Sequence, residues 1–181
     1  MKRLITISLF IICLVGIMSI TQGKGFFKVG EPAPTFTLTS VTGEAVSLAD
    51  LHGKVVVLGL FHICKPCLIQ GTNLQKVYEA TQGKPVTVVG VNSSGDTKAE
   101  ITRFLQAFPV TVTYPYLVDP KQITDTLYGG GKFIPNIYVI DQHGVIRWQR
   151  VGNFFTDGKL AGHEIILQEV NKLLATSSSP L

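Results

Sequence analysis

The feature that most constrains the fold is a strand pattern that ends at a pair of cysteines and leads straight into a helix pattern. The run Val55–Phe61 is apolar and rich in β-branched residues, which is typical of a central strand covered on both faces. Leu68–Thr81 has the composition of a helix that ends before Gly83. Between them stands Cys64-Lys65-Pro66-Cys67, whose proline suits the first turn of that helix. This junction predicts an α/β domain with two cysteines at one edge of its sheet.

The rest of the chain alternates between strand and helix patterns. Thr35–Leu38 and Ala45–Leu48 alternate around a Thr-Gly-Glu turn and predict an N-terminal β-hairpin. Further extended segments are expected at Val86–Val91, Thr111–Val118, Ile137–Ile140 and Val145–Val151, and further helices at Thr97–Phe108, Lys121–Tyr128 and Lys159–Leu174. This order predicts a mixed central sheet with helices on both faces, and the thioredoxin fold fits it.

The two ends of the chain differ in composition from the domain between them. Met1-Lys2-Arg3 and the apolar run Leu4–Ile20 have the layout of a secretory signal, so residues 1–23 are predicted to be a signal peptide or an N-terminal membrane anchor. In both cases we expect a periplasmic or other extracytoplasmic protein, soluble after cleavage or held by this segment. Residues 26–175 are predicted to form one thioredoxin-like domain, and the serine-rich residues 176–181 a disordered tail.

Composition and cysteine count narrow the class of protein. With 45% hydrophobic and 15% charged residues the chain is expected to be globular. Its net charge of +4 comes from scattered basic residues, so no nucleic-acid partner is expected. One of the three cysteines, Cys13, lies in the apolar N-terminal run, which leaves two in the domain. A disulfide between Cys64 and Cys67 would close a tiny loop and add little stability, which favours a redox role for the pair.

The positions of the two cysteines suggest which one is the nucleophile and which one resolves the mixed disulfide. At a helix N-terminus the free backbone N–H groups and the helix dipole stabilise a thiolate, here that of Cys64. Lys65 adds a positive charge, and His62 adds another when it is protonated. Cys67 lies one turn into the helix and should be more buried. We therefore predict that Cys64 is the nucleophile and Cys67 the resolving cysteine, with Lys65 and Pro66 completing the catalytic motif.

The residues alone leave two other interpretations of the pair, a purely structural disulfide and a metal site. Tetrahedral zinc needs four ligands, and no second CxxC or HxxxH motif supplies them. His52, His143 and His163 lie in separate segments and are expected to be ordinary surface or turn histidines. No metal and no cofactor is therefore expected beyond the redox-active disulfide Cys64–Cys67.

A second element of interest is Ile134-Pro135, which follows a run of glycines and precedes a predicted strand. From the residues alone, Pro135 is either an ordinary loop proline or a cis-proline placed against the disulfide.

The chain resembles the TlpA-type thiol–disulfide oxidoreductases of the thioredoxin superfamily, which include cytochrome c maturation proteins. The resemblance spans nearly the whole domain and rests on Ala33–Leu38, Gly43, Ser47–Leu58, Cys64–Cys67, Ile134-Pro135 and Val139–Gly144. It implies that the Ile134–Pro135 bond is cis and that a substrate chain binds along Ile134 and Pro135.

The chain departs from the family pattern at three positions near the cysteines. Ile63 stands where members usually carry tryptophan or another aromatic residue, and Gln70 where many carry a proton-handling glutamate. Leu58 occupies the position of a buried aspartate in thioredoxin itself. Deprotonation of Cys67 is therefore expected to depend on water or another group.

The sequence is thus interpreted as an enzyme that exchanges disulfides with exported proteins and with a separate redox donor or acceptor, which can be membrane-bound. The Lys-Pro dipeptide favours an oxidant, but the resemblance favours a protein-disulfide reductase, and we expect the latter. One alternative is a thiol peroxidase, although Phe61 stands where peroxiredoxins carry threonine. The other is a non-enzymatic copper chaperone using Cys64, Cys67 and His62, although such relatives have a wider CxxxC spacing.

Overall fold

A computed structural model of the chain describes residues 29–128, 134–152 and 160–177. Within these residues a single seven-stranded sheet has the order β2-β1-β5-β4-β3-β6-β7. The strands are β1 (Thr37–Ser40), β2 (Ala45–Ser47), β3 (Val55–Phe61), β4 (Val86–Asn92), β5 (Tyr116–Val118), β6 (Asn136–Ile140) and β7 (Ile146–Val151). The helices are a 3-10 turn η1 (Ala49–Leu51), α1 (Lys65–Ala80), α2 (Lys98–Gln106), α3 (Ile123–Leu127) and α4 (His163–Ser177).

The sheet is mixed, as the sequence predicts. Strand β3 lies at its centre, parallel to β4 and antiparallel to β6, and all of its side chains are buried. β4 and β5 are also parallel, whereas β1–β2 and β6–β7 form antiparallel hairpins. Because β3 and β6 run in opposite directions, the end of β3 and the start of β6 lie at the same edge of the sheet.

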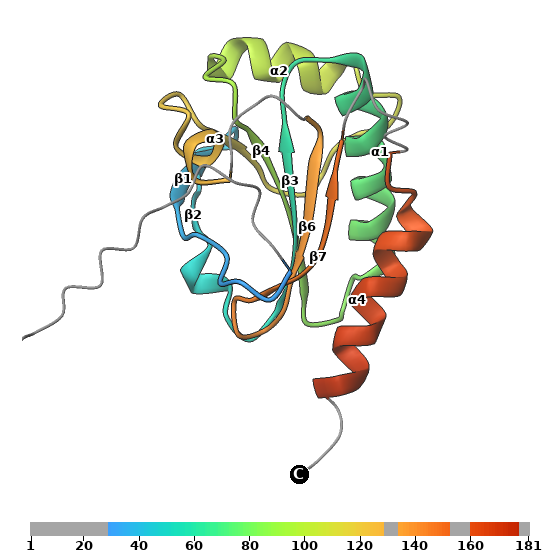
Figure 1. The fold of residues 1–181 in the computed structure, drawn as a ribbon. Helices are drawn as coiled ribbons and strands as arrows, with labels where there is room; N and C mark the ends of the chain where they lie inside the picture. The colour runs from blue at the N-terminus through green and yellow to red at the C-terminus, as the bar shows by residue number, and fades with distance from the viewer. Residues whose placement is uncertain (1–28, 129–133, 153–159, 178–181) are drawn as a thin grey trace, which may run out of the picture.

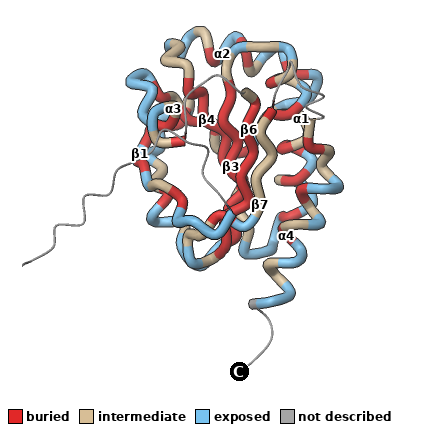
Figure 2. Tube along the Cα trace, in the orientation of Figure 1, coloured by how far each residue is buried: buried red, intermediate tan, exposed pale blue. Residues whose placement is uncertain are grey.

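Two hydrophobic clusters lie on the two faces of the sheet. Figure 1 shows α1 and α4 together on one side of the sheet, and Figure 2 shows the central strands as the most buried part of the fold. The first cluster joins the odd-numbered β3 residues Val55, Val57 and Phe61 to side chains of α1, α2 and α4. The second joins the even-numbered β3 residues to β6, to Tyr128 after α3, and to the N-terminal hairpin, including Phe36. This alternation follows from the two-residue period of a strand. The predicted thioredoxin-like architecture is confirmed.

Several boundaries differ from those predicted. Only Tyr116–Val118 of the expected extended segment 111–118 joins the sheet. Earlier in that segment the backbone N–H of Thr113 donates to the side chain of Gln75, a contact 38 residues apart in the chain. Helix α4 begins at His163, and the predicted start at Lys159 lies outside the described residues. The helix continues through Ser177, beyond the predicted end at Leu174.

The predicted signal or anchor, residues 1–23, lies outside the described residues, as do residues 178–181 of the predicted tail. Among the residues that the structure does describe, no helix is both long enough and apolar enough to cross a bilayer.

Candidate active site

Cys64 and Cys67 form a disulfide where β3 gives way to α1. Their Cα atoms are 5.2 Å apart, within the usual range for a disulfide. Cys64 is the N-cap of α1, with an extended backbone (φ −152°, ψ 156°), and Pro66 lies in the first helical turn. The helix therefore begins at the motif itself, slightly earlier than the sequence pattern predicts.

The two sulfur atoms have different surroundings. Cys67 is completely buried in the first hydrophobic cluster, whereas Cys64 is half-buried and lies at its margin. The backbone N–H of Cys67 donates to Sγ of Cys64 at 3.3 Å. Such a bond at a helix N-terminus favours negative charge on the acceptor sulfur. The structure thus gives Cys64 the access and the polar contact that a nucleophile needs, and it shields Cys67.

Ile134 and Pro135 lie at the same edge of the sheet as the disulfide. The Ile134–Pro135 bond is cis, as the family resemblance implies. β6 begins directly afterwards, and its first residue, Asn136, pairs with Leu60 near the end of β3. Ile134 is half-buried and contacts both hydrophobic clusters, while Pro135 is buried. The topology therefore brings the two predicted elements of the site together.

Gln70, interpreted from the sequence only as a missing carboxylate, has a role of its own. Its buried carboxamide donates to the carbonyl of Ala161 at 2.9 Å and accepts from the backbone N–H of Ala161 at 2.9 Å. Asn73, one turn further along α1, donates to the same carbonyl at 3.1 Å. These bonds tie α1, one turn after Cys67, to the residue that lies just before α4. The only sign of these bonds in the sequence is that an amide side chain stands on the face of the helix expected to be buried.

Leu58 and Cys67 belong to different hydrophobic clusters. The alternation of β3 directs Leu58 to the face covered by the second cluster, where its side chain is completely buried. Leu58 is therefore an ordinary core residue of this chain.

His62 is the residue near the disulfide whose setting differs most from expectation. Its Nε2 atom is buried and has no hydrogen-bond partner. Burial lowers the pKa of His62, and the carboxylates of Asp125 and Asp96 oppose that effect without cancelling it. The imidazole is therefore mainly neutral at pH 7, and it does not add the positive charge that its position suggested.

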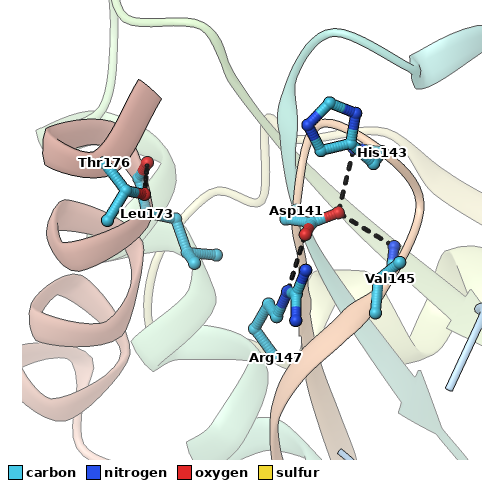
Figure 3. Close-up of polar contacts among 6 residues, drawn as sticks. All are labelled: Asp141, His143, Val145, Arg147, Leu173 and Thr176. Carbon is cyan, nitrogen blue, oxygen red and sulfur yellow. Dashed lines mark hydrogen bonds and ion pairs between the residues drawn. The ribbon is translucent and has the colours of Figure 1, made fainter. Parts of the chain in front are cut away.

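The remaining histidines are distributed as the sequence predicts. His143 lies in the β6–β7 turn, where its backbone N–H donates to Asp141 at 2.9 Å (Figure 3). Burial alone would raise the pKa of Asp141, but hydrogen bonds from Val145, Arg147 and His143 outweigh it and lower that pKa. His163, at the start of α4, lies 3.1 Å from the carboxylate of Glu164. At the other end of α4 the hydroxyl of Thr176 donates to the carbonyl of Leu173 (Figure 3). In the described parts of the chain, no group of three or more potential ligands is arranged to hold a metal ion.

Comparison with known proteins agrees with this geometry. The model of the AhpC/TSA family matches residues 29–149, which is most of the chain. The chain belongs to the AhpC/TSA family. A "Thioredoxin-like protein YneN" of Bacillus subtilis is 35% identical over 126 residues, covering 68% of this chain and 71% of the relative. A "Thiol-disulfide oxidoreductase ResA" of Geobacillus thermodenitrificans is 28% identical over 153 residues, covering 81% of this chain and 86% of the relative.

Among solved structures, a putative thiol:disulfide interchange protein DsbE from Chlorobium tepidum superposes with a TM-score of 0.68 at 30% identity. The match covers 81% of this chain and 98% of that one. Together with the Cys64–Cys67 disulfide, these similarities confirm the predicted TlpA-type thiol–disulfide oxidoreductase with a thioredoxin fold.

Proposed function

We propose that this protein exchanges its Cys64–Cys67 dithiol with disulfides of exported proteins, with Cys64 attacking and Cys67 resolving. The observation that carries the proposal is the asymmetry of the pair. Cys64 caps a helix and accepts the N–H of Cys67, while Cys67 is completely buried. A thiolate at Cys64 is therefore both stabilised and accessible to a second protein.

The exchange proceeds in two steps that balance atoms and electrons. The Cys64 thiolate attacks one sulfur of the substrate disulfide, forms a mixed disulfide and releases the other substrate sulfur as a thiolate. Cys67 then gives its proton to the released thiolate or to water and attacks Sγ of Cys64. This attack expels the second substrate sulfur as a thiolate. The substrate has gained two electrons, and the protein is left with the Cys64–Cys67 disulfide that the structure contains. No further redox group is needed for this exchange, because the Cys64–Cys67 dithiol itself supplies the two electrons and becomes the disulfide.

Ile134 and Pro135 are proposed to bind the substrate chain beside the disulfide. Their position at the same sheet edge as Cys64 supports this role. We further propose that the protein acts as a reductase, which requires a separate donor to return the dithiol after each turnover. The sequence of residues 1–23 supports export, with the domain working outside the cytosol as a cleaved or anchored protein.

Trapping of mixed disulfides tests the order of attack. In a Cys67→Ser variant, exposed to extracts of exported proteins, substrates should accumulate in covalent complexes with Cys64 that a thiol reductant releases. Cys64→Ser is the matched control and should trap none. Accumulation on Cys67 in the control variant would reverse the two roles, and mass spectrometry of the complexes would identify the substrate.

A thiol peroxidase is the second candidate, because the matching family carries the AhpC/TSA description. The position three residues before Cys64 is Phe61, which is completely buried and stacks on Tyr116 with ring centroids 6.0 Å apart. It therefore offers no hydroxyl to a peroxide. We expect the reduced protein to reduce disulfides faster than hydrogen peroxide, and turnover of peroxide at the higher rate would favour the second candidate.

A further inference from the structure

Gly152 directly follows β7 and contacts the loop that holds the cis-proline. Its backbone N–H donates to the carbonyl of Pro135 at 2.8 Å. The same N–H lies 3.2 Å from Oδ1 of Asn136, whose side chain is buried. Asn136 also pairs with Val151 across β6 and β7. The single N–H group of Gly152 thus donates both to Pro135 and to Asn136, the residue that follows it.

The space beside Gly152 is too small for any side chain. A Cβ atom there would stand 2.3 Å from the carbonyl oxygen of Pro135, and 2.9 Å from both its N and its Cδ atoms. Two of these atoms belong to the backbone and the third to the proline ring, so none of them can leave the contact by a side-chain rotation. Among the described glycines, Gly152 alone has backbone atoms of another segment as the nearest neighbours of such a Cβ. A side chain could be accommodated only if the Pro135 peptide moved.

Backbone conformation does not explain this glycine. The described glycines with positive φ are Gly30, Gly43, Gly53, Gly83, Gly95 and Gly144, and Gly152 is not among them. Its φ therefore lies outside the left-handed region that favours glycine, and the close approach to Pro135 is what requires the missing side chain.

We propose that Gly152 is a positioning residue that sets where Pro135 stands beside Cys64, and so governs exchange with polypeptide disulfides. This inference rests on the proposed function, in which a substrate chain binds along Ile134 and Pro135. A small disulfide reaches Cys64 without lying along that loop. Displacement of the proline therefore weakens exchange with a peptide and leaves exchange with a small molecule unchanged.

Gly152→Ala tests the inference through the ratio of two rates. The reduced protein is assayed with a disulfide-cyclised peptide and with the small disulfide 5,5′-dithiobis(2-nitrobenzoic acid). A shift of about 1 Å in Ile134 and Pro135 should lower kcat/KM for the peptide roughly ten- to hundredfold. The rate with the small disulfide should match that of the wild-type protein.

Gly162→Ala is the matched control. Gly162 lies at the other end of the β7–α4 connection, and an added Cβ would meet only Oε2 of Glu164, at the tip of a flexible side chain, at 2.9 Å. Both of its rates should stay at the wild-type level. Asn136→Ala removes the second acceptor of the Gly152 N–H without adding bulk, and it should lower the peptide rate selectively, but less than Gly152→Ala does.

The outcomes separate this inference from the function on which it rests. Selective loss of the peptide rate in Gly152→Ala, or in Asn136→Ala if the first variant does not fold, supports it. Equal losses with both substrates in a folded variant, or an unchanged peptide rate, overturn it. A wild-type protein that exchanges with neither substrate refutes the proposed function instead.

Discussion

Replacing Gln70 with glutamate would make the two hydrogen bonds between this side chain and the Ala161 backbone, here called the clamp, depend on pH. The carboxamide of Gln70 serves both polar groups of the Ala161 backbone, one as a donor and one as an acceptor. A protonated carboxylic acid can do the same, because its O–H replaces the donating N–H. An ionised carboxylate cannot, since it would place an oxygen bearing negative charge against the carbonyl of Ala161 in a buried position. The native fold should therefore hold the proton on Glu at position 70.

The magnitude follows from linkage between protonation and folding. Burial and the hydrogen bond to the neutral form both raise the folded-state pKa above the unfolded value of about 4.3. Below that value both states are protonated, and the Gln70→Glu variant should be nearly as stable as the wild type. As pH rises above it, the unfolded state loses its proton first, so stability falls by about 1.4 kcal/mol per pH unit. At pH 7 the loss should approach about 4 kcal/mol, unless the folded-state pKa is reached first.

Urea unfolding of the wild type and the variant between pH 4 and pH 8 measures this difference. Gln82→Glu is a matched control, because the amide of Gln82 also donates to a backbone carbonyl, that of Tyr78 at 2.9 Å, but is exposed. Its stability relative to the wild type should change little with pH. If the difference in unfolding free energy between Gln70→Glu and the wild type stays constant over this pH range, the clamp does not discriminate between the neutral and the ionised acid.

The structure makes further predictions about stability, all measurable by urea or thermal unfolding. Tyr116→Phe should keep or raise stability, by about 1 kcal/mol, since the buried hydroxyl of Tyr116 lacks a partner. Tyr128→Phe should instead lose about 1 kcal/mol, because its hydroxyl donates to a carbonyl at 2.7 Å; equal effects would contradict both assignments. The lowered pKa of His62 makes the native state less stable as pH falls below about 6.5. His62→Gln should reduce that acid sensitivity, and an identical pH profile would argue against burial of the imidazole. Gly71→Ala should cost about 1–3 kcal/mol despite better helix propensity, because the new Cβ would lie 2.4 Å from a Phe108 ring carbon; a rise in Tm would refute the crowding.

Local patterns were sufficient where one strong periodicity decides an element. The unbroken apolar run of β3 predicts its bounds without error, because every one of its side chains is buried. The motif that follows predicts the start of a helix and which of its two cysteines faces inward, since both follow from the local helix geometry.

Contacts between distant segments could not be predicted in this way. Gln70 and Ala161 are 91 positions apart, and nothing near Gln70 in the sequence indicates that its amide binds a backbone from the end of the domain. The close approach of Gly152 to Pro135 exists only because β6 and β7 pair. The cis bond at Pro135 was predicted from the family resemblance, because the residues themselves leave both isomers open.

A thermodynamic cycle links the reduction of the Cys64–Cys67 disulfide to the stability of the fold, and the short span of the bond makes the unfolded chain a simple reference state. Cys64 and Cys67 are only three positions apart, so the bond restricts the unfolded chain little. Because the cycle closes, the difference in unfolding free energy between the oxidised and the reduced protein equals the difference in reduction free energy of the disulfide between the folded and the unfolded chain. Each 1.4 kcal/mol corresponds to about 30 mV. Two denaturation curves, one for each redox form, therefore report the direction of exchange: an oxidant is more stable when reduced, and a reductant when oxidised.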